Sequence, residues 1–262
     1  MRPLAEFSAS DRRGIKVLLS DIDDTMTTDG RLPAATLAAL EDLAAAGIKL
    51  VPVTGRPAGW CDHIARMWPV DAVVGENGAL WFSYDRKTRK MHSHFAKSEQ
   101  ERKEDRARLD ALQRQILDAV PGAGIASDQF CRIADLAIDF CEDVEPLCQA
   151  SIDRIVKMFE DAGAVAKVSS IHVNGWFGAY DKKSMTAHCL STRFGLDIDR
   201  DNSALVFAGD SPNDQPMFEH FIHGVGVANV RDFTLDHCPR WVTQSKAGDG
   251  FVELAEALLQ VR

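Results

Sequence analysis

Residues 15–25, IKVLLSDIDDT, contain the feature that decides the fold. Residues 15–19 are an almost continuous apolar run rich in β-branched and aliphatic residues, which is typical of a strand buried on both faces of a sheet. The run ends abruptly in Asp21, Asp23 and Asp24. Ligands of open α/β sheets bind beyond the carboxyl ends of the strands. We therefore expect a polar site where this strand ends.

The same pattern occurs three more times along the chain. Apolar runs that end in polar residues lie at 48–53, 71–75 and 203–209, and they are followed by TGRP, ENG and DSPND. Segments with helical spacing, such as 33–46 and 182–195, alternate with these runs. The alternation predicts βαβ units and an α/β, Rossmann-like core with a mostly parallel sheet.

The middle of the chain has a different pattern. A charged helix is expected over 98–120, opened by a Ser98–Glu101 capping box. A strand, an amphipathic helix and a strand pair are expected at 131–140, 145–163 and 164–177. These features predict an inserted α+β cap domain over 84–180, which interrupts a core domain formed by 1–83 and 181–262. Residues 1–13 are expected to be a polar tail.

The composition excludes several classes of function. The chain has 30 Lys plus Arg and 39 Asp plus Glu, a formal charge of −9, which argues against a general nucleic-acid binder. No apolar run approaches the roughly 18 residues that would span a bilayer, and residues 1–14 contain no apolar signal region. We expect a soluble cytoplasmic protein with no nucleic-acid or membrane partner. The six cysteines form no CxxC pair and are expected to be reduced and packed as small apolar residues.

Carboxylates at two strand ends are the first chemical signal. Asp21 and Asp23 leave one strand, and Asp210 and Asp214 follow another. Like charges brought together raise one another's pKa, and a divalent cation relieves that cost. Oxygen ligands favour a hard ion such as Mg²⁺. The alternative interpretation is an ordinary polar turn and, at the second strand, a helix cap.

A second signal is a set of groups suited to phosphate. The hydroxyl of Thr54 and the amides around Gly55 follow a strand and can hold phosphate oxygens. A lysine at the start of a helix, Lys183 or its neighbour Lys182, opposes the helix dipole and is expected to have a partner. An exposed surface lysine is the alternative.

Taken together, these motifs resemble the haloacid dehalogenase superfamily of phosphohydrolases. DIDDT at 21–25 matches its first motif, Thr54 its second, Lys183 its third and GDSPND at 209–214 its fourth. The insert between the second and third motifs, together with GENGA at 75–79 and AGDG at 247–250, is similar to the type IIB or Cof-like branch. The third-motif lysine of that branch is commonly followed by Gly, whereas Ser184 follows here. Lys183 is chosen by counting back from residues 194–196, and Lys182 remains the alternative.

The resemblance implies a role for each core residue. Asp21 would be the nucleophile that forms an aspartyl-phosphate, and Asp23 the general acid and base. Thr54 and Lys183 would hold the phosphoryl oxygens, and Asn213 would donate a hydrogen bond near Asp21. Mg²⁺ would be bound by a set of four residues: Asp21, the Asp23 carbonyl, Asp210 and Asp214.

The resemblance also implies that the cap selects the substrate. Arg56 and Asn77 are candidates for the mouth of the site. His172, Asn174 and Trp176 alternate along one strand, so their side chains are expected on the same side, as candidate substrate contacts. A half-exposed strand face is the alternative. The predicted function is a Mg²⁺-dependent phosphomonoesterase acting on a small phosphorylated metabolite, a sugar phosphate by analogy. The alternatives are a phosphomutase of the phosphomannomutase type and a catalytically silent binding or regulatory protein.

Overall fold

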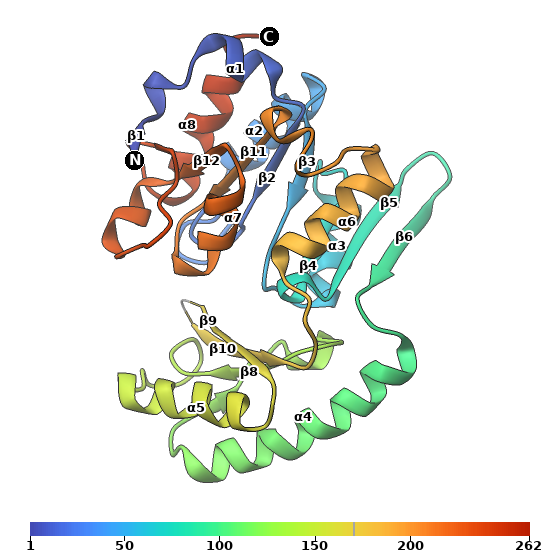
Figure 1. The fold of residues 1–262 in the computed structure, drawn as a ribbon, viewed down its shortest axis with the longest axis vertical. Helices are drawn as coiled ribbons and strands as arrows, with labels where there is room; N and C mark the ends of the chain where they lie inside the picture. The colour runs from blue at the N-terminus through green and yellow to red at the C-terminus, as the bar shows by residue number, and fades with distance from the viewer. Residues whose placement is uncertain (170) are drawn as a thin grey trace.

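The computed structural model describes residues 1–169 and 171–262, and its larger unit is built on a six-stranded sheet (Figure 1). The strand order is β1-β13-β12-β11-β2-β3, and every pair is parallel. The strands are β1 (Arg2–Pro3), β2 (Val17–Ser20), β3 (Lys49–Pro52), β11 (Leu205–Gly209), β12 (His223–Gly226) and β13 (Trp241–Val242). The predicted mostly parallel α/β core is therefore confirmed.

Helices cover both faces of this sheet. Successive residues of β2 point to opposite faces, so its apolar side chains pack in two separate clusters. Leu18 packs in the apolar cluster that includes α2 (Ala34–Ala45), α3 (Ala58–Met67) and α8 (Ala247–Leu259). Val17 and Leu19 pack in the opposite cluster with α6 (Lys182–Phe194) and α7 (Gln215–His220). Both faces of β2 are thus buried, as the continuous apolar run predicts.

The N-terminal residues are not the expected polar tail. They form β1, a short 3-10 helix at Leu4–Glu6 and α1 (Ala9–Gly14). Phe7 is 1% exposed, and its ring stacks on Trp241 with 5.2 Å between centroids. The two residues of this segment that are buried, Leu4 and Phe7, lie three apart among polar neighbours and give no periodic signal. The prediction of a polar tail was therefore wrong for a reason that only the tertiary structure reveals.

A hairpin extends the larger unit on its other side. β4 (Val73–Gly75), β5 (Leu80–Asp85) and β6 (Lys90–Phe95) form a three-stranded antiparallel sheet. A parallel bridge between Val53 and Val74 joins this sheet to the chain that follows β3. The proposed cap, residues 84–180, therefore begins within β5, and its own sheet starts only at β7.

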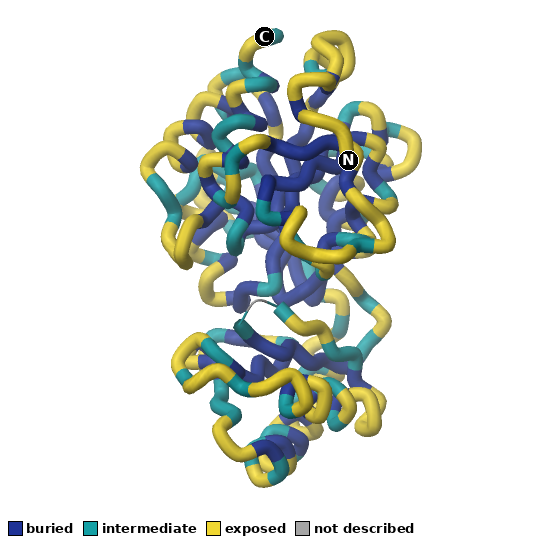
Figure 2. Tube along the Cα trace, turned by 90° about the vertical axis from the view of Figure 1, so that its left-hand side faces the viewer, coloured by how far each residue is buried: buried dark blue, intermediate teal, exposed yellow. Residues whose placement is uncertain are grey.

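The smaller unit lies below this hairpin in Figure 1 and has a core of its own. Its antiparallel sheet has the order β7-β8-β10-β9, formed by β7 (Gly124–Ile125), β8 (Leu136–Asp139), β10 (His172–Trp176) and β9 (Val165–Val168). The helices α4 (Glu99–Ala119) and α5 (Gln149–Asp161) pack on one face of it, and the Ser98–Glu101 capping box opens α4 as predicted. Figure 2 shows a buried centre in each unit.

The remaining short elements are 3-10 helices: η2 (Glu76–Gly78), η3 (Gln129–Cys131), η4 (Asn202–Ala204), η5 (Pro212–Asp214) and η6 (Ala228–Asp232). Within the described ranges, no helix has the length and apolar character that a membrane crossing needs. The six cysteines are free thiols, but only Cys61 and Cys189 are buried, and Cys148 and Cys238 are exposed. The predicted packing as small apolar residues therefore holds for two of them.

Candidate active site

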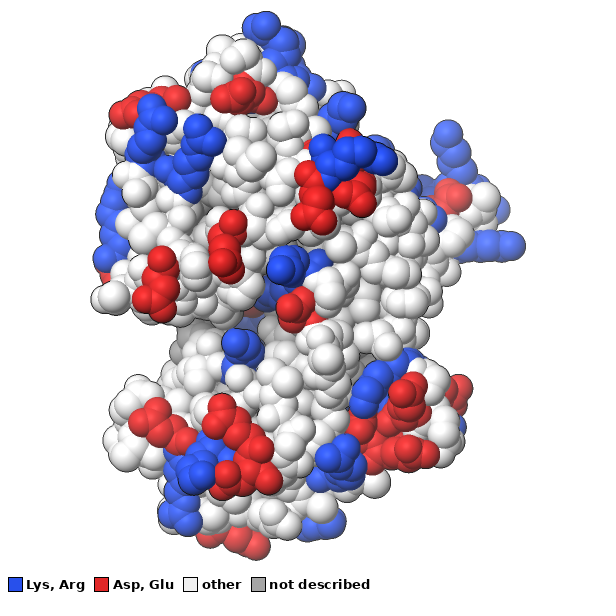
Figure 3. All heavy atoms as spheres, in the orientation of Figure 1, with Lys and Arg blue, Asp and Glu red and all other residues white. Residues whose placement is uncertain are grey.

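The polar ends of β2, β3 and β11 meet at one edge of the parallel sheet, where they face the smaller unit (Figure 1). A pocket of about 630 Å³ lies between the two units and is lined by residues of both. Figure 3 shows the hollow between the units with charged side chains of both signs around it. The predicted location of the site, at the carboxyl ends of the strands, matches this pocket.

Three carboxylates form the centre of the site. Oxygen atoms of Asp21, Asp210 and Asp214 lie within 4.8 Å of one another, and all three side chains are buried. Burial, reinforced by the neighbouring carboxylates, raises the pKa of Asp21 to about 7 and that of Asp210 to about 9. A cluster of ionised oxygens that is this costly to bury fits a hard divalent cation such as Mg²⁺.

Lys182 is the lysine of the site. Its Nζ lies 2.7 Å from Asp21 Oδ1 and 3.2 Å from Asp214 Oδ1, and its side chain is buried. Burial lowers the pKa of Lys182, but the two carboxylates outweigh burial and hold the pKa above its ordinary value. The Lys182 side chain is therefore positively charged at neutral pH.

The choice of Lys183 is thus corrected to Lys182. Helix α6 begins at Lys182, and its N-cap residue Asp181 forms a capping box with Ser184. Successive helical residues are turned by about 100°, so only one of two adjacent lysines can face the site. Lys183 is exposed and lies beside Asp199 and Glu219 instead. Counting from the far end of the helix selected the wrong neighbour.

Two residues that the sequence analysis did not single out support Asp210. Thr25 Oγ1 donates to Asp210 Oδ1 at 3.1 Å, and Asn229 Nδ2 donates to Asp210 Oδ2 at 3.0 Å. Asp214 Oδ2 accepts the Asp210 backbone N–H at 3.0 Å. Asn229 lies in η6, three residues after the end of β12. The rule that polar residues near strand ends form the site, applied to this strand as well, would have found it.

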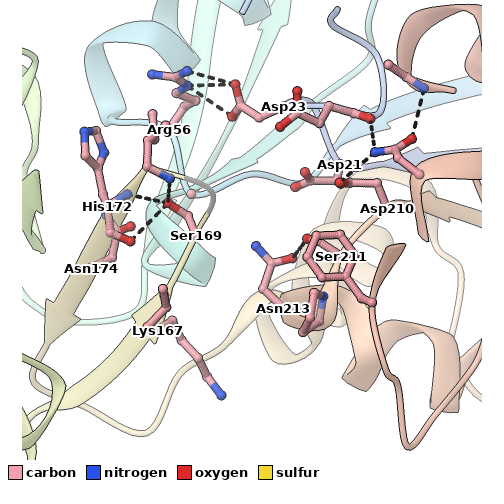
Figure 4. Close-up of a pocket in the computed structure, with 18 of the residues that line it drawn as sticks. Asp21, Asp23, Arg56, Lys167, Ser169, His172, Asn174, Asp210, Ser211 and Asn213 are labelled. Carbon is pink, nitrogen blue, oxygen red and sulfur yellow. Dashed lines mark hydrogen bonds and ion pairs between the residues drawn. The ribbon is translucent and has the colours of Figure 1, made fainter. Parts of the chain in front are cut away.

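Asp23 faces the pocket but stands apart from the carboxylate cluster. Arg56 donates to it through Nε at 3.1 Å and through a terminal nitrogen at 2.9 Å (Figure 4). The Arg56 guanidinium also stacks on the Trp60 ring, 4.5 Å from its centroid, and lies 3.8 Å from carboxylate oxygens of Asp128 and Glu142. Arg56 thereby fixes the direction of the Asp23 carboxylate and connects it to the smaller unit.

The other predicted core residues lie around this centre. Gly55, Asn77 and Asn213 line the pocket. Thr54 is fully buried, and its hydroxyl accepts the backbone N–H of Arg56 at 3.0 Å. Asn213 Oδ1 accepts from Ser211 Oγ at 2.9 Å (Figure 4), and its predicted hydrogen bond near Asp21 stays a prediction.

The smaller unit supplies the opposite wall. His172 and Asn174 line the pocket together with Lys167 and Ser169 (Figure 4). Asn174 Nδ2 donates to Asp135 Oδ2 at 3.1 Å. His172 Nε2 lies 2.8 Å from Glu142 Oε2, and burial is the main effect that lowers the pKa of His172.

Trp176, which the sequence places with His172 and Asn174, is not part of this wall. Its ring is buried, 2% exposed, and stacks on Tyr180 with 5.9 Å between centroids. Trp176 is not among the residues that line the pocket, and its ring packs on Tyr180 instead. The prediction that Trp176 contacts substrate is therefore corrected to a packing role.

Comparisons with known proteins agree with this geometry. Residues 18–104 match the model of the haloacid dehalogenase-like hydrolase family, and this stretch contains the first two motifs of the resemblance. No curated protein matches the chain. Among solved structures, Thermoplasma acidophilum 0175 is 18% identical with a TM-score of 0.68, covering 95% of this chain and 99% of that one.

Two further similar structures are described as phosphatases or relatives of phosphatases. The sucrose-phosphatase of Synechocystis sp. PCC6803, in complex with sucrose and phosphate, is 19% identical with a TM-score of 0.64, covering 94% of this chain and 98% of that one. A trehalose-6-phosphate phosphatase related protein is 14% identical with a TM-score of 0.61, covering 94% and 96%. These likenesses support the same fold, a parallel α/β core with an inserted cap.

Proposed function

We propose that the chain is a Mg²⁺-dependent phosphomonoesterase that acts on a small phosphorylated metabolite through an aspartyl-phosphate, and the match of residues 18–104 to the haloacid dehalogenase-like hydrolase family supports this proposal. One observation carries this proposal. The buried Lys182 ammonium joins Asp21 and Asp214 at the base of a pocket that Asp23 also faces. This arrangement supports Asp21 as the nucleophile, Lys182 as the cation for phosphoryl oxygens and Asp23 as the acid–base group.

The first step is attack on phosphorus. A carboxylate oxygen of Asp21 forms a bond to phosphorus while the bond from phosphorus to the ester oxygen breaks. The departing oxygen takes a proton from the Asp23 carboxyl group, which leaves a neutral alcohol and an ionised Asp23. Lys182 offers N–H donors to the phosphoryl oxygens on which negative charge lies in the transition state.

The second step returns the enzyme to its starting state. Asp23, now a carboxylate, takes a proton from a water molecule whose oxygen attacks phosphorus, and the bond from phosphorus to Asp21 breaks. Inorganic phosphate leaves, and Asp23 is protonated again. The Arg56 contacts aim the Asp23 carboxyl group into the pocket in both steps.

Asp21, Asp210 and Asp214, with the Asp23 carbonyl that the resemblance adds, are the residues that would hold Mg²⁺. When bound, the ion would neutralise the charge shared by the phosphate ester and the carboxylates, which otherwise repel one another.

The cap wall supports a polyhydroxylated substrate. His172, Asn174 and Ser169 line the pocket from the cap side and offer polar groups that can form hydrogen bonds with substrate hydroxyl groups. One of the similar structures is described in complex with sucrose and phosphate. We take a sugar phosphate as the first class of substrate to test.

The test is release of inorganic phosphate from a panel of phosphorylated sugars, other phosphorylated metabolites and a simple aryl phosphate. Each is measured with Mg²⁺ and with EDTA, for the wild-type chain and for Asp21→Asn. The proposal expects release that needs the metal and is lost in the variant. Conversion of a hexose 1-phosphate into its 6-phosphate without net release, when a bisphosphate activator is added, would favour the phosphomutase. Metal binding without any turnover would favour the silent binding protein.

A further inference from the structure

The turn Glu76-Asn77-Gly78, which we call the ENG turn, connects β4 to β5 and is completely or almost completely buried. All three residues have positive φ, at 46°, 54° and 103°. This conformation is unfavourable for residues other than glycine, so surrounding contacts must hold it. The Glu76 N–H donates to the Arg56 carbonyl at 3.0 Å, and the Asn77 N–H donates to the Thr54 carbonyl at 3.1 Å. The turn is thereby joined to residues 54–56, which are proposed to bind phosphate and which we call the phosphate-binding loop.

The same turn also contacts the start of α6. A Cβ atom at Gly78 would lie 2.0 Å from the carbonyl oxygen of Asp181, so only glycine allows this approach. Asp181 is the N-cap of the helix whose first residue is Lys182. The turn therefore touches the elements that carry Thr54, a predicted phosphate ligand, and Lys182, the lysine that the structure places in the site.

The Glu76 side chain reaches a third element, the cap. Glu76 Oε1 accepts the backbone N–H of Ala58 and that of Ile133, both at 2.8 Å, and Oε2 accepts the N–H of Ala134 at 2.6 Å. Ala58 begins α3 of the core, whereas Ile133 and Ala134 belong to the cap. One buried carboxylate thus joins backbone of both units.

A second contact reinforces this junction. Arg132, beside these cap residues, donates to the Gly55 carbonyl at 3.1 Å. Arg132 is also held by Asp135, whose other contact is the Asn174 amide of the pocket wall. The cap segment that is fixed by Glu76 therefore leads directly to a residue facing the substrate pocket.

From these contacts we infer that Glu76 is a positioning residue that holds the cap wall over the phosphate-binding loop. Its kinetic consequence rests on the proposed phosphatase function, while the docking contact itself does not. Burial raises the pKa of Glu76 to about 7, with Asp135 adding to the effect, so the three N–H donors offset a substantial cost. Nothing in the proposed chemistry requires a carboxylate here, and the positions of its donors explain its presence.

The test variant is Glu76→Gln, which keeps the shape of the side chain. The Gln side chain has only one oxygen. If this oxygen accepts the N–H groups of Ala58 and Ile133, the NH₂ group faces the Ala134 N–H, and two donors cannot form a hydrogen bond. We expect the Ala134 amide to lose its protection from hydrogen exchange, while the Ala58 amide on the core side keeps it. Ile133→Pro tests the junction from the cap side, because proline has no N–H, and Arg132 before it already has the extended backbone that a following proline requires.

The kinetic arm compares two substrates. For the best substrate of the panel, whose organic part is large enough to reach the cap, kcat/KM is expected to fall about 10- to 100-fold, the range for losing a hydrogen bond to a charged group. For a small aryl phosphate it should stay within about threefold, because the core contacts remain. Asp197→Asn is the matched control: its carboxylate also accepts backbone N–H groups, but on the exposed surface of the core, and it should change neither reading.

Two results would overturn the inference. One is a rate of hydrogen exchange at the Ala134 amide that is unchanged from the wild type in both Glu76→Gln and Ile133→Pro. The other is an equal fall in kcat/KM for both substrates. If the wild-type chain releases no phosphate at all, the proposed function fails, and the exchange measurement alone then decides whether Glu76 docks the cap.

Discussion

The two adjacent lysines at the start of α6 allow a sharp test of the site. We predict that Lys182→Met is damaging and Lys183→Met is nearly silent. The two variants make the same chemical change one residue apart. Lys182 is buried against Asp21 and Asp214, whereas Lys183 is exposed.

The magnitude follows from these contacts. Removing the Lys182 ammonium leaves two buried carboxylates without their cation, and breaking a buried ion pair from one side costs about 3–5 kcal/mol. At about 2–4 °C per kcal/mol for a chain of this size, the melting temperature should fall by about 6–20 °C. Loss of a donor to the phosphoryl oxygens should lower kcat by about 10²–10³-fold. An exposed substitution such as Lys183→Met should stay within about 0.5 kcal/mol.

The assay is thermal unfolding of the metal-free chains at about pH 8, followed by steady-state phosphate release with Mg²⁺. This pH keeps more of Asp21 ionised, since its pKa is about 7. The assignment of Lys182 would be refuted if Lys183→Met lost activity while Lys182→Met kept wild-type stability and turnover. The geometry described for the base of the pocket would then be wrong as well.

Three further outcomes are expected. In the metal-free chain Asp21 and Asp210 have pKa values of about 7 and about 9, above their ordinary 3.8, so the folded state binds protons that the unfolded state has released. The free energy of unfolding should therefore fall as pH rises from about 4 to about 9. The rise in melting temperature that Mg²⁺ causes should be larger at about pH 8.5 than at about pH 6. A shift that is equal at both pH values would contradict this. Arg56→Lys loses the two-pronged contact with Asp23 and should lower kcat about tenfold with the fold intact, and an unchanged kcat would remove Arg56 from its orienting role. Phe7→Ala should cost about 3–5 kcal/mol in urea unfolding, because Phe7 is a buried core residue, whereas a loss below about 1 kcal/mol would restore the polar-tail interpretation of residues 1–13.

Much of the core could be predicted because its strands have a one-dimensional signal. A strand buried on both faces, such as β2, needs an uninterrupted apolar run, and the polar residues that follow it must lie at the carboxyl edge of the sheet. That rule places Asp21, Asp23 and Asp210 at one pocket, where the structure has them. It missed Asn229 because the same rule was not applied to β12.

The failures share a different cause, since they depend on contacts between distant segments. Phe7 is buried by stacking on Trp241, which lies more than two hundred residues away. The Glu76 carboxylate can be buried because it accepts three backbone N–H groups, two of them from the cap. No local spacing encodes these arrangements.

The central claim is that Asp21 becomes covalently phosphorylated. The direct measurement is rapid acid quenching during turnover of the best substrate, followed by peptide mass spectrometry of the wild-type chain and of Asp21→Asn. The account predicts one added phosphoryl group on the peptide that contains Asp21, with the modification sited on that residue and absent from the variant. A phosphoryl group on another residue, or phosphate release at the wild-type rate by Asp21→Asn, would contradict it.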